Sequence, residues 1–200
     1  MDRRDSELLI RLREGDESAF DRIVERYERR LIGYFFSFSG DRHLSEDCAQ
    51  EVFIRLYRAR ESYSPDAALA TFLFRIAKNY WIDVYRSRKV RPEERALDDR
   101  AEESDAEPAG PSLGKRLAAE DEQPGERLSH EEDLAQLQVA MAQLPQIQQS
   151  VLALAGGQGM KYEQVAEVLG IPIGTVKSRV HAAVQNLRRL MGSGESEAPE

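Results

Sequence analysis

Residues 161–190 read KYEQVAEVLGIPIGTVKSRVHAAVQNLRRL, and this stretch decides the fold of the C-terminal part of the chain. Its first apolar residues recur at i, i+3, i+4 and i+7, the spacing of one helix face: Tyr162, Val165, Ala166 and Leu169. Gly170 suits a left-handed helix end, and Pro172 suits a turn or the first position of a new helix. The stretch therefore predicts two short helices joined by a tight corner, a helix-turn-helix.

The second of these helices has two different faces. Its apolar face contains Ile173, Val176, Val180, Val184 and Leu187. Its opposite face contains Thr175, Lys177, Ser178, Arg179, His181, Gln185 and Arg188. Basic side chains suit guanine edges, glutamine suits adenine, and hydroxyls suit phosphates or bases, so this helix is expected to lie in a DNA major groove. The spacing alone leaves an alternative open, which is an ordinary helical hairpin with a solvated basic face.

Composition narrows the class of protein. The chain has 200 residues, of which 41% are hydrophobic and 32% are charged. Its one cysteine, Cys48, excludes an intrachain disulfide, and its three histidines have no metal-ligand spacing, so neither a metal nor a cofactor is expected. No apolar run approaches the roughly 20 residues that cross a bilayer, and the N-terminal MDRRDSELL lacks a signal-peptide core. We expect a cytoplasmic protein with no direct membrane insertion.

The net charge of −8 is distributed unevenly along the chain. Residues 1–91 have a net charge of +2 and residues 134–192 a net charge of +3. Residues 92–133 have a net charge of −10, and the tail at 193–200 adds −3. Because a phosphate backbone senses charge only within about a Debye length, the acidic middle does not exclude nucleic-acid binding by either flanking part.

Three helical stretches are expected before residue 64, and the first is a turn or two from Leu8 to Arg13. Asp16 can cap a helix that runs to Gly40 with an aromatic cluster in its core. Ser45 can cap the next helix, which buries Cys48, Val52, Leu56 and Ala59. The outer face of that helix contains Asp47, Gln50, Glu51, Arg55 and Arg58.

A long helix is expected from about Ala68 to Lys89. Its inward stripe is predicted to contain Leu73, Ile76, Tyr80 and Val84. Another face interleaves aromatic and basic side chains, namely Phe74, Lys78, Trp81, Tyr85 and Arg88. Such a ridge suits a single-stranded nucleic acid, because bases stack on rings while cations follow phosphates. The alternative is that Trp81 and Tyr85 pack on a neighbouring helix.

The fold class predicted is all-α, with two small helical domains joined by a long acidic flexible linker. The first domain is predicted at 1–91 and the linker at 92–128, where Glu, Asp, Ala, Pro and Gly replace apolar periodicity. The second domain is predicted at 129–192, opened by a capping box at Ser129, with a helix at 147–155 and a turn at 156–159. The tail at 193–200 is expected to be disordered.

Four runs resemble a known family. They are LREGDESAFDRIVERYERRL at 12–31, SEDCAQEVFIRLYRA at 45–59, ATFLFRIAKNYWIDVYR at 70–86 and YEQVAEVLGIPIGTVKSRVHAAVQNLR at 162–188. Together they resemble sigma factors of the extracytoplasmic-function (ECF) group of the sigma-70 family, in family order. The resemblance implies a subunit that binds core RNA polymerase, with a region 2 domain that melts the −10 promoter element and a region 4 domain that reads the −35 element as duplex.

The resemblance also implies roles for individual residues. Polymerase contacts would come from Asp47, Gln50, Glu51 and Arg55. The single-stranded −10 element would meet a base pocket at 63–70 and the long helix, through Tyr63, Ser64, Asp66, Phe74, Lys78, Asn79, Trp81, Asp83, Tyr85 and Arg86. The duplex −35 element would meet Thr175, Lys177, Ser178, Arg179, His181 and Gln185. An anti-sigma factor is the regulator that the resemblance implies.

Two other classes of function are the alternatives. A dimeric helix-turn-helix regulator binding operator DNA would use the same recognition helix, but it needs a dimerisation surface or a ligand pocket. An enzyme is not expected, because no nucleophile–base pair or metal cluster is present in the sequence pattern, and Gly156-Gly157-Gln158-Gly159 lacks the Lys-Ser/Thr of a phosphate loop.

Overall fold

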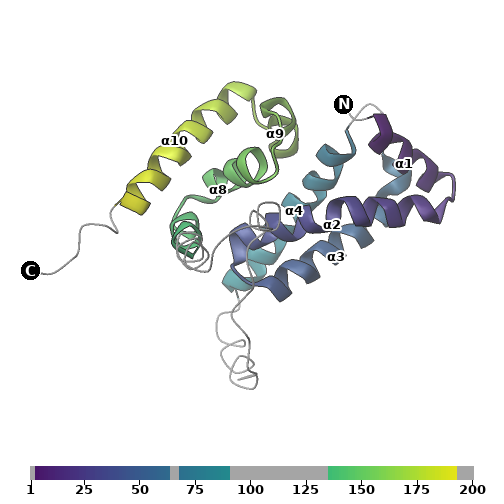
Figure 1. Ribbon diagram of the computed structural model, residues 1–200, viewed down its shortest axis with the longest axis horizontal. Helices are drawn as coiled ribbons and strands as arrows, with labels where there is room; N and C mark the ends of the chain where they lie inside the picture. The colour runs from purple at the N-terminus through teal and green to yellow at the C-terminus, as the bar shows by residue number, and fades with distance from the viewer. Residues whose placement is uncertain (1–2, 64–67, 91–134, 193–200) are drawn as a thin grey trace, which may run out of the picture.

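The computed structural model describes residues 3–63, 68–90 and 135–192, and every regular element in these ranges is helical (Figure 1). The N-terminal bundle consists of α1 (Arg3–Arg13), α2 (Glu17–Ser39), α3 (Arg42–Ala59), the 3-10 turn η1 (Arg60–Ser62) and α4 (Leu69–Val90). The C-terminal unit consists of a helical segment at 135–142, α8 (Gln146–Leu152), the π-helical turn η2 (Ala153–Gly157), α9 (Tyr162–Leu169) and α10 (Ile173–Gly192). The predicted all-α class is confirmed. The expected linker, tail and Ser129 cap lie outside the described residues.

Helix α2 is the central element of the N-terminal bundle and contacts both α1 and α3. Asp16 caps it as predicted, with one carboxylate oxygen accepting a hydrogen bond from the Ser18 N–H at 3.1 Å. Gly40 ends the helix with a left-handed backbone, φ 65°, a conformation that costs glycine little. The buried residues of α2 recur every three or four positions, apart from one adjacent pair: Ala19, Ile23, Tyr27, Leu31, Tyr34 and Phe35.

The Asp16 carboxylate should make stability depend on pH. Hydrogen bonds from Ser18 and from Arg11 hold its pKa below the ordinary value of 3.8. A carboxylate with a lowered folded-state pKa stabilises the fold above its ordinary pKa, and that contribution disappears as the pH falls through the lowered value. Asn is an equally good cap without the charge, so we expect the difference in unfolding temperature between wild type and Asp16→Asn to shrink below about pH 3.8. Parallel pH profiles in thermal unfolding would contradict this, and Asp21→Asn controls for loss of one negative charge.

The start of α3 differs from the prediction. Asp41, not Ser45, is its N-cap, and the Asp41 Oδ1 accepts a hydrogen bond from the Leu44 N–H at 3.0 Å. Ser45 is buried one turn later, where its hydroxyl donates to the Asp41 carbonyl oxygen. Aspartate and serine are comparable caps, so local preference could not choose between them.

Aromatic rings from α2 and α4 fill the centre of the N-terminal bundle. The Tyr34 ring centre lies 5.4 Å from that of Phe74, and the Trp81 ring centre lies 5.4 Å from Phe38 and 6.0 Å from Phe35. Burial raises the pKa of the Tyr34 hydroxyl. The predicted core role of the α2 aromatic cluster is confirmed for Tyr34 and Phe35, whereas Phe36 and Phe38 are only partly buried.

Helices α9 and α10 form the predicted helix-turn-helix. Gly170 ends α9 in the left-handed region, φ 68°, and its N–H donates to the Ala166 carbonyl oxygen at 2.8 Å. The core between α8, α9 and α10 includes Val151, Val165, Val168, Val176 and Ala183.

Two residues expected on the inner faces are exposed, and a further five are only partly buried, namely Ala166, Leu169, Val180, Val184 and Leu187. Tyr162 is 36% exposed and Ile173 is 38% exposed. Each is the first residue of its helix, so fewer neighbouring side chains cover it than cover the later turns. Val176 and Ala183 are the fully buried residues of α10.

The end of α8 also differs from the prediction. The helix expected at 147–155 is a regular α-helix only as far as Leu152. It then widens into the π-helical turn η2, which continues through Gly157. The Gln158 N–H donates to the Ala153 carbonyl oxygen at 3.0 Å, and Gly159 follows with φ 62°. The wide turn places the 158–160 segment beside the N-terminal bundle, where α2 contacts η2 and α4 contacts α9.

Candidate functional site

The solvent side of α4 presents a polar row. Arg75, Asn79, Asp83 and Arg86 are exposed and recur at i, i+4, i+8 and i+11, so they lie along one face of the helix. Asn79, Asp83 and Arg86 are residues that the sequence predicted to meet a nucleic-acid strand. Arg75 was missed as a site residue, although its spacing of four before Asn79 could have revealed it.

The expected aromatic and basic ridge of α4 is interrupted. Phe74 is completely buried and Trp81 is 6% exposed, because their rings pack against Tyr34, Phe35 and Phe38 of α2. The alternative reading of Trp81, packing on a neighbouring helix, is therefore the correct one. Tyr85 is 45% exposed and Lys78 is half-buried, so these two remain accessible members of the ridge.

The inward stripe of α4 is rotated relative to the prediction. Leu73 is buried as expected, but Ile76, Tyr80 and Val84 are only partly buried. Phe74, Ala77 and Trp81 take the most buried positions instead. Helix α4 packs against α2 and α3 on one side and against α9 of the C-terminal unit on another. Its apolar face is therefore wider than a single stripe.

The segment before α4 is described only in part. The Tyr63 ring is buried and packs edge-on against Phe72, with ring centres 5.3 Å apart. Ser64 and Asp66, which the sequence predicted to line a base pocket, lie outside the described residues. Ala68, Leu69 and Ala70 at the start of α4 are described and line a small cavity with residues of the C-terminal unit.

The outer face of α3 contains the residues expected to bind a protein partner. Asp47 and Gln50 are exposed, whereas Glu51 and Arg55 form an ion pair along the helix at 2.8 Å. The Arg55 guanidinium also lies 4.4 Å from the Tyr80 ring centre and 3.9 Å from the Asp83 carboxylate. Arg55 is thus turned toward α4 and connects the polar faces of the two helices.

Two exposed hydrophobic side chains on α3 were missed by the sequence reasoning. Ile54 is 45% exposed and Tyr57 is 38% exposed, at four and seven residues after Gln50. The sequence could have revealed them, because both are apolar residues that lie outside the stripe of Cys48, Val52 and Leu56. They add apolar surface to a polar face, and the centre of a protein interface is usually more apolar than its rim.

The first turns of α10 form the second candidate surface. Lys177, Ser178, His181 and Gln185 are exposed, and Thr175 and Arg179 are half-buried. The helix contains no acidic residue from Ile173 to Gly192. An Asn186 Nδ2 to Gln148 Oε1 hydrogen bond of 2.9 Å ties α10 to α8 on its other side. The face can therefore approach a polyanion without repulsion from its own helix.

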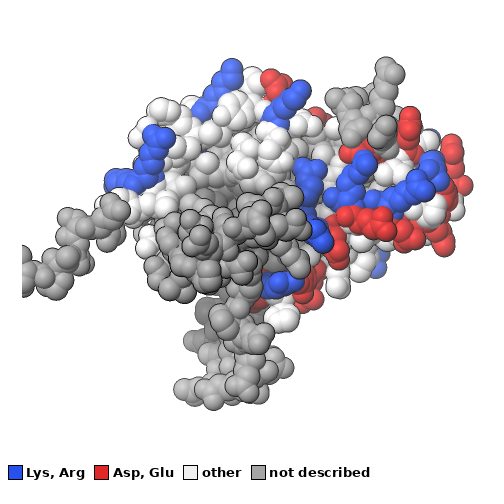
Figure 2. Space-filling view, in the orientation of Figure 1, with Lys and Arg blue, Asp and Glu red and all other residues white. Residues whose placement is uncertain are grey.

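On the visible face of the molecule, the two parts of the chain differ in their surface charge (Figure 2). Basic and acidic side chains are mixed closely over the N-terminal bundle, whereas the C-terminal unit shows mainly uncharged surface with scattered basic side chains and some acidic surface near α9. A phosphate backbone is bound more readily by a surface without intervening carboxylates.

Comparison with known proteins assigns the family. The family models described as Sigma-70 region 2 and Sigma-70, region 4 match residues 23–91 and 134–187. The ECF RNA polymerase sigma factor SigE of Mycolicibacterium smegmatis is 32% identical over 191 residues, covering 93% of this chain and 68% of that protein. This chain belongs to the ECF RNA polymerase sigma factors. The RNA polymerase sigma-H factor of Pseudomonas aeruginosa is also 32% identical to this sigma factor, over 94% of this chain and 93% of that protein.

Solved structures share the fold. CnrH, in complex with the cytosolic domain of CnrY, has a TM-score of 0.65 at 21% identity and covers 94% of this chain and 97% of that chain. RpoE in complex with the anti-sigma factor NepR, from Bartonella quintana, has a TM-score of 0.63 at 23% identity, covering 86% and 96%. As a member of its group, this sigma factor acts in transcription initiation by RNA polymerase.

The described part of the chain offers neither a membrane span nor a metal site. No helix among residues 3–63, 68–90 and 135–192 has both the length and the apolar character needed to cross a membrane. Within the same ranges, no group of three or more His, Cys, Asp or Glu side chains is placed to hold a metal ion.

Proposed function

We propose that this sigma factor reads its promoter with two separate faces. Residues 1–91 bind the −10 element as an opened strand, residues 129–192 bind the −35 element as duplex, and residues 92–128 connect them. The observation that supports this division is the pair of polar faces on different units, one on α4 and one on α10. The tail at 193–200 has no assigned role.

The α4 face suits an unpaired strand. Arg75 and Arg86 can neutralise phosphates, and Asn79 and Asp83 can hydrogen-bond to base edges, where a carboxylate suits the amino group of cytosine. The exposed Tyr85 ring offers a base a stacking surface, and Lys78 lies two turns earlier on the same face. These contacts offset the few kcal/mol that unstacking a base costs. Ser64 and Asp66 remain proposed contacts at the adjoining pocket, whereas Tyr63, Phe74 and Trp81 are buried and contribute as core residues around α4.

The α10 face suits the major groove. Lys177 and Arg179 can meet guanine or phosphate, and Gln185 can meet adenine. Thr175, Ser178 and His181 complete the surface with short polar side chains. Few cations are present, so the isolated chain should bind duplex weakly and act mainly within the polymerase complex.

Lys177→Ala should weaken binding to the −35 element. We expect the affinity of the polymerase–sigma complex for duplex promoter to fall roughly tenfold, because one major-groove or phosphate contact is typically worth 1–3 kcal/mol. Lys161→Ala removes another exposed lysine, outside α10, and is the matched control. Equal affinities for the two variants in a fluorescence anisotropy titration would contradict the assignment of the α10 face.

The α3 face is proposed to bind core RNA polymerase. Asp47 and Gln50 supply polar contacts, and Ile54 and Tyr57 supply the apolar centre that a stable protein interface needs. Glu51 and Arg55 contribute by orienting each other and by linking this face to α4.

The remaining partners follow from the same assignment. Because the polymerase and the chromosome are cytoplasmic in bacteria, we place this sigma factor in the cytoplasm. It has no catalytic role of its own, since the polymerase forms the phosphodiester bonds. An anti-sigma factor is the expected regulator, by analogy with the RpoE–NepR complex.

Transcription in vitro tests the proposal. Purified chain and core polymerase are combined on genomic fragments, and start sites are mapped. Initiation at a small set of sites that share −10 and −35 sequences, absent without the chain, supports the proposal. A stable dimer in light scattering that binds duplex tightly without polymerase would instead favour a helix-turn-helix regulator.

A further inference from the structure

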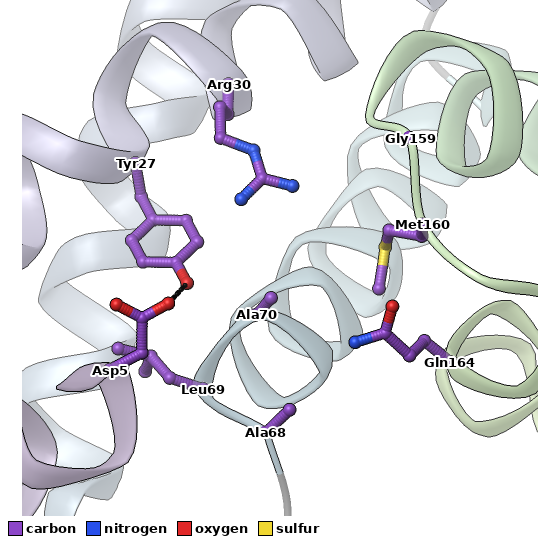
Figure 3. A pocket seen from close by; sticks show the side chains of 9 residues that line it. All are labelled: Asp5, Tyr27, Arg30, Ala68, Leu69, Ala70, Gly159, Met160 and Gln164. Atoms are coloured by element: carbon purple, nitrogen blue, oxygen red, sulfur yellow. Dashed lines mark hydrogen bonds between the residues drawn. The ribbon is translucent and has the colours of Figure 1, made fainter. Parts of the chain in front are cut away.

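The C-terminal unit lies against the N-terminal bundle at the first turn of α4. A cavity of about 260 Å³ is lined by both parts of the chain (Figure 3). Ala68, Leu69 and Ala70 form one wall, and Gly159, Met160 and Gln164 form the facing wall. The Gln164 side chain points across the cavity toward the start of α4 in this view. The first turn of α4, which adjoins the proposed base pocket, is therefore covered by the C-terminal unit.

Arg30 of α2 joins the two parts directly. Its Nη2 donates to the Gln158 carbonyl oxygen at 3.2 Å, and its Nε donates to the Gln158 Oε1 at 3.4 Å. The guanidinium lies 5.2 Å from the Tyr27 ring centre and 5.4 Å from that of Phe74. Both rings belong to the N-terminal core, so Arg30 is oriented by its own bundle and directed at η2 and the segment after it.

The acceptor is presented by the unusual backbone of the 153–160 segment. The π-helical hydrogen bond from the Gln158 N–H to the Ala153 carbonyl oxygen widens the last turn after α8. The left-handed Gly159 then reverses the chain, and Met160 is buried. π-Helical turns are frequently found at functional positions.

A third hydrogen bond joins the two parts near the C-terminal end of α2. The Gln138 Nε2 donates to the Phe36 carbonyl oxygen at 3.4 Å. These three hydrogen bonds between the units are rather long, at 3.2 to 3.4 Å, so they can break and reform, and they act beside the packing of α4 against α9. The α10 face takes no part in them, since α10 contacts mainly α8 and α9.

We propose that Arg30 and the 158–160 segment form an intramolecular latch that keeps the first turn of α4 covered in the unbound chain. The latch rests on the proposed function, because it regulates access to the −10 surface. The latch leaves the −35 face of α10 exposed. It blocks only the binding of the single-stranded −10 element to α4. Binding to polymerase, which needs the exposed α3 face, is then free to begin before the latch opens.

Arg30→Ala in the full chain tests the latch. Arg29→Ala, one residue away on the exposed side of α2, removes the same charge and is the matched control. Dyes on cysteines introduced at Glu25 and Glu167, in a Cys48→Ala background, report the separation of the two units by energy transfer. The second readout is binding of a single-stranded oligonucleotide that carries the mapped −10 sequence.

We expect Arg30→Ala to lower energy transfer and to tighten strand binding about fivefold, the low end of usual coupling between sites. Arg29→Ala should leave energy transfer unchanged. It should lower the affinity for the single-stranded oligonucleotide slightly, because any lost cation does so. Equal energy transfer in the two variants would overturn the latch, and so would opening without tighter strand binding. If wild type fails to initiate transcription with polymerase, the proposed function fails, while energy transfer still decides whether the units are latched.

Discussion

Replacing Ile54 with aspartate should abolish transcription initiation by this sigma factor. Ile54 is 45% exposed on α3, beside Tyr57 and four residues after Gln50. If this face is the centre of the polymerase interface, the substitution removes an apolar contact and buries an unpaired carboxylate. We expect the dissociation constant for core polymerase to rise about 100-fold. Competition binding against wild type, followed by a transcription assay, measures it.

Val139→Asp is the control for this substitution. Val139 is 63% exposed on the helical segment at 135–142, so the change places the same charge on an exposed apolar site away from α3. Both variants should have the circular dichroism spectrum of wild type. An Ile54→Asp protein that still initiates as well as Val139→Asp would place the polymerase interface elsewhere.

Trp81→Ala should unfold much of the N-terminal bundle instead of acting through DNA alone. The Trp81 side chain is 6% exposed and packs against Phe35 and Phe38. Truncating a buried aromatic residue leaves a cavity and typically costs 3–5 kcal/mol. We expect a loss of that order in the free energy of unfolding, measured by urea denaturation with circular dichroism.

Tyr85→Ala separates the two roles that the sequence pattern assigned to one ridge. Tyr85 lies four residues after Trp81 but is 45% exposed, so its loss should change stability by less than about 0.5 kcal/mol. It should still weaken binding of the −10 strand, because stacking on an aromatic ring contributes about 1–3 kcal/mol per base. Trp81→Ala with normal stability and impaired strand binding would show that Trp81 meets the strand after all.

The helix-turn-helix could be predicted from the sequence because its signals are local. Gly170 marks the end of α9, and the polar face of α10 follows from a period of 3.6 residues. The Asp16 cap, the Gly40 stop and the four family-like runs are local in the same sense. They were sufficient to predict the all-α class and the family.

The orientation of α4 was decided only by tertiary structure. The helix has apolar residues on several sides, so more than one stripe fits its periodicity. Packing against α2 placed Phe74 and Trp81 inside and left Tyr85 in solvent. The exposure of Ile54 and Tyr57 depends on which other helices reach α3. The contact between Arg30 and Gln158 joins residues that lie 128 positions apart in the chain. Periodicity shows that a helix has an apolar side, but the burial of a given side chain depends on which other helices reach it.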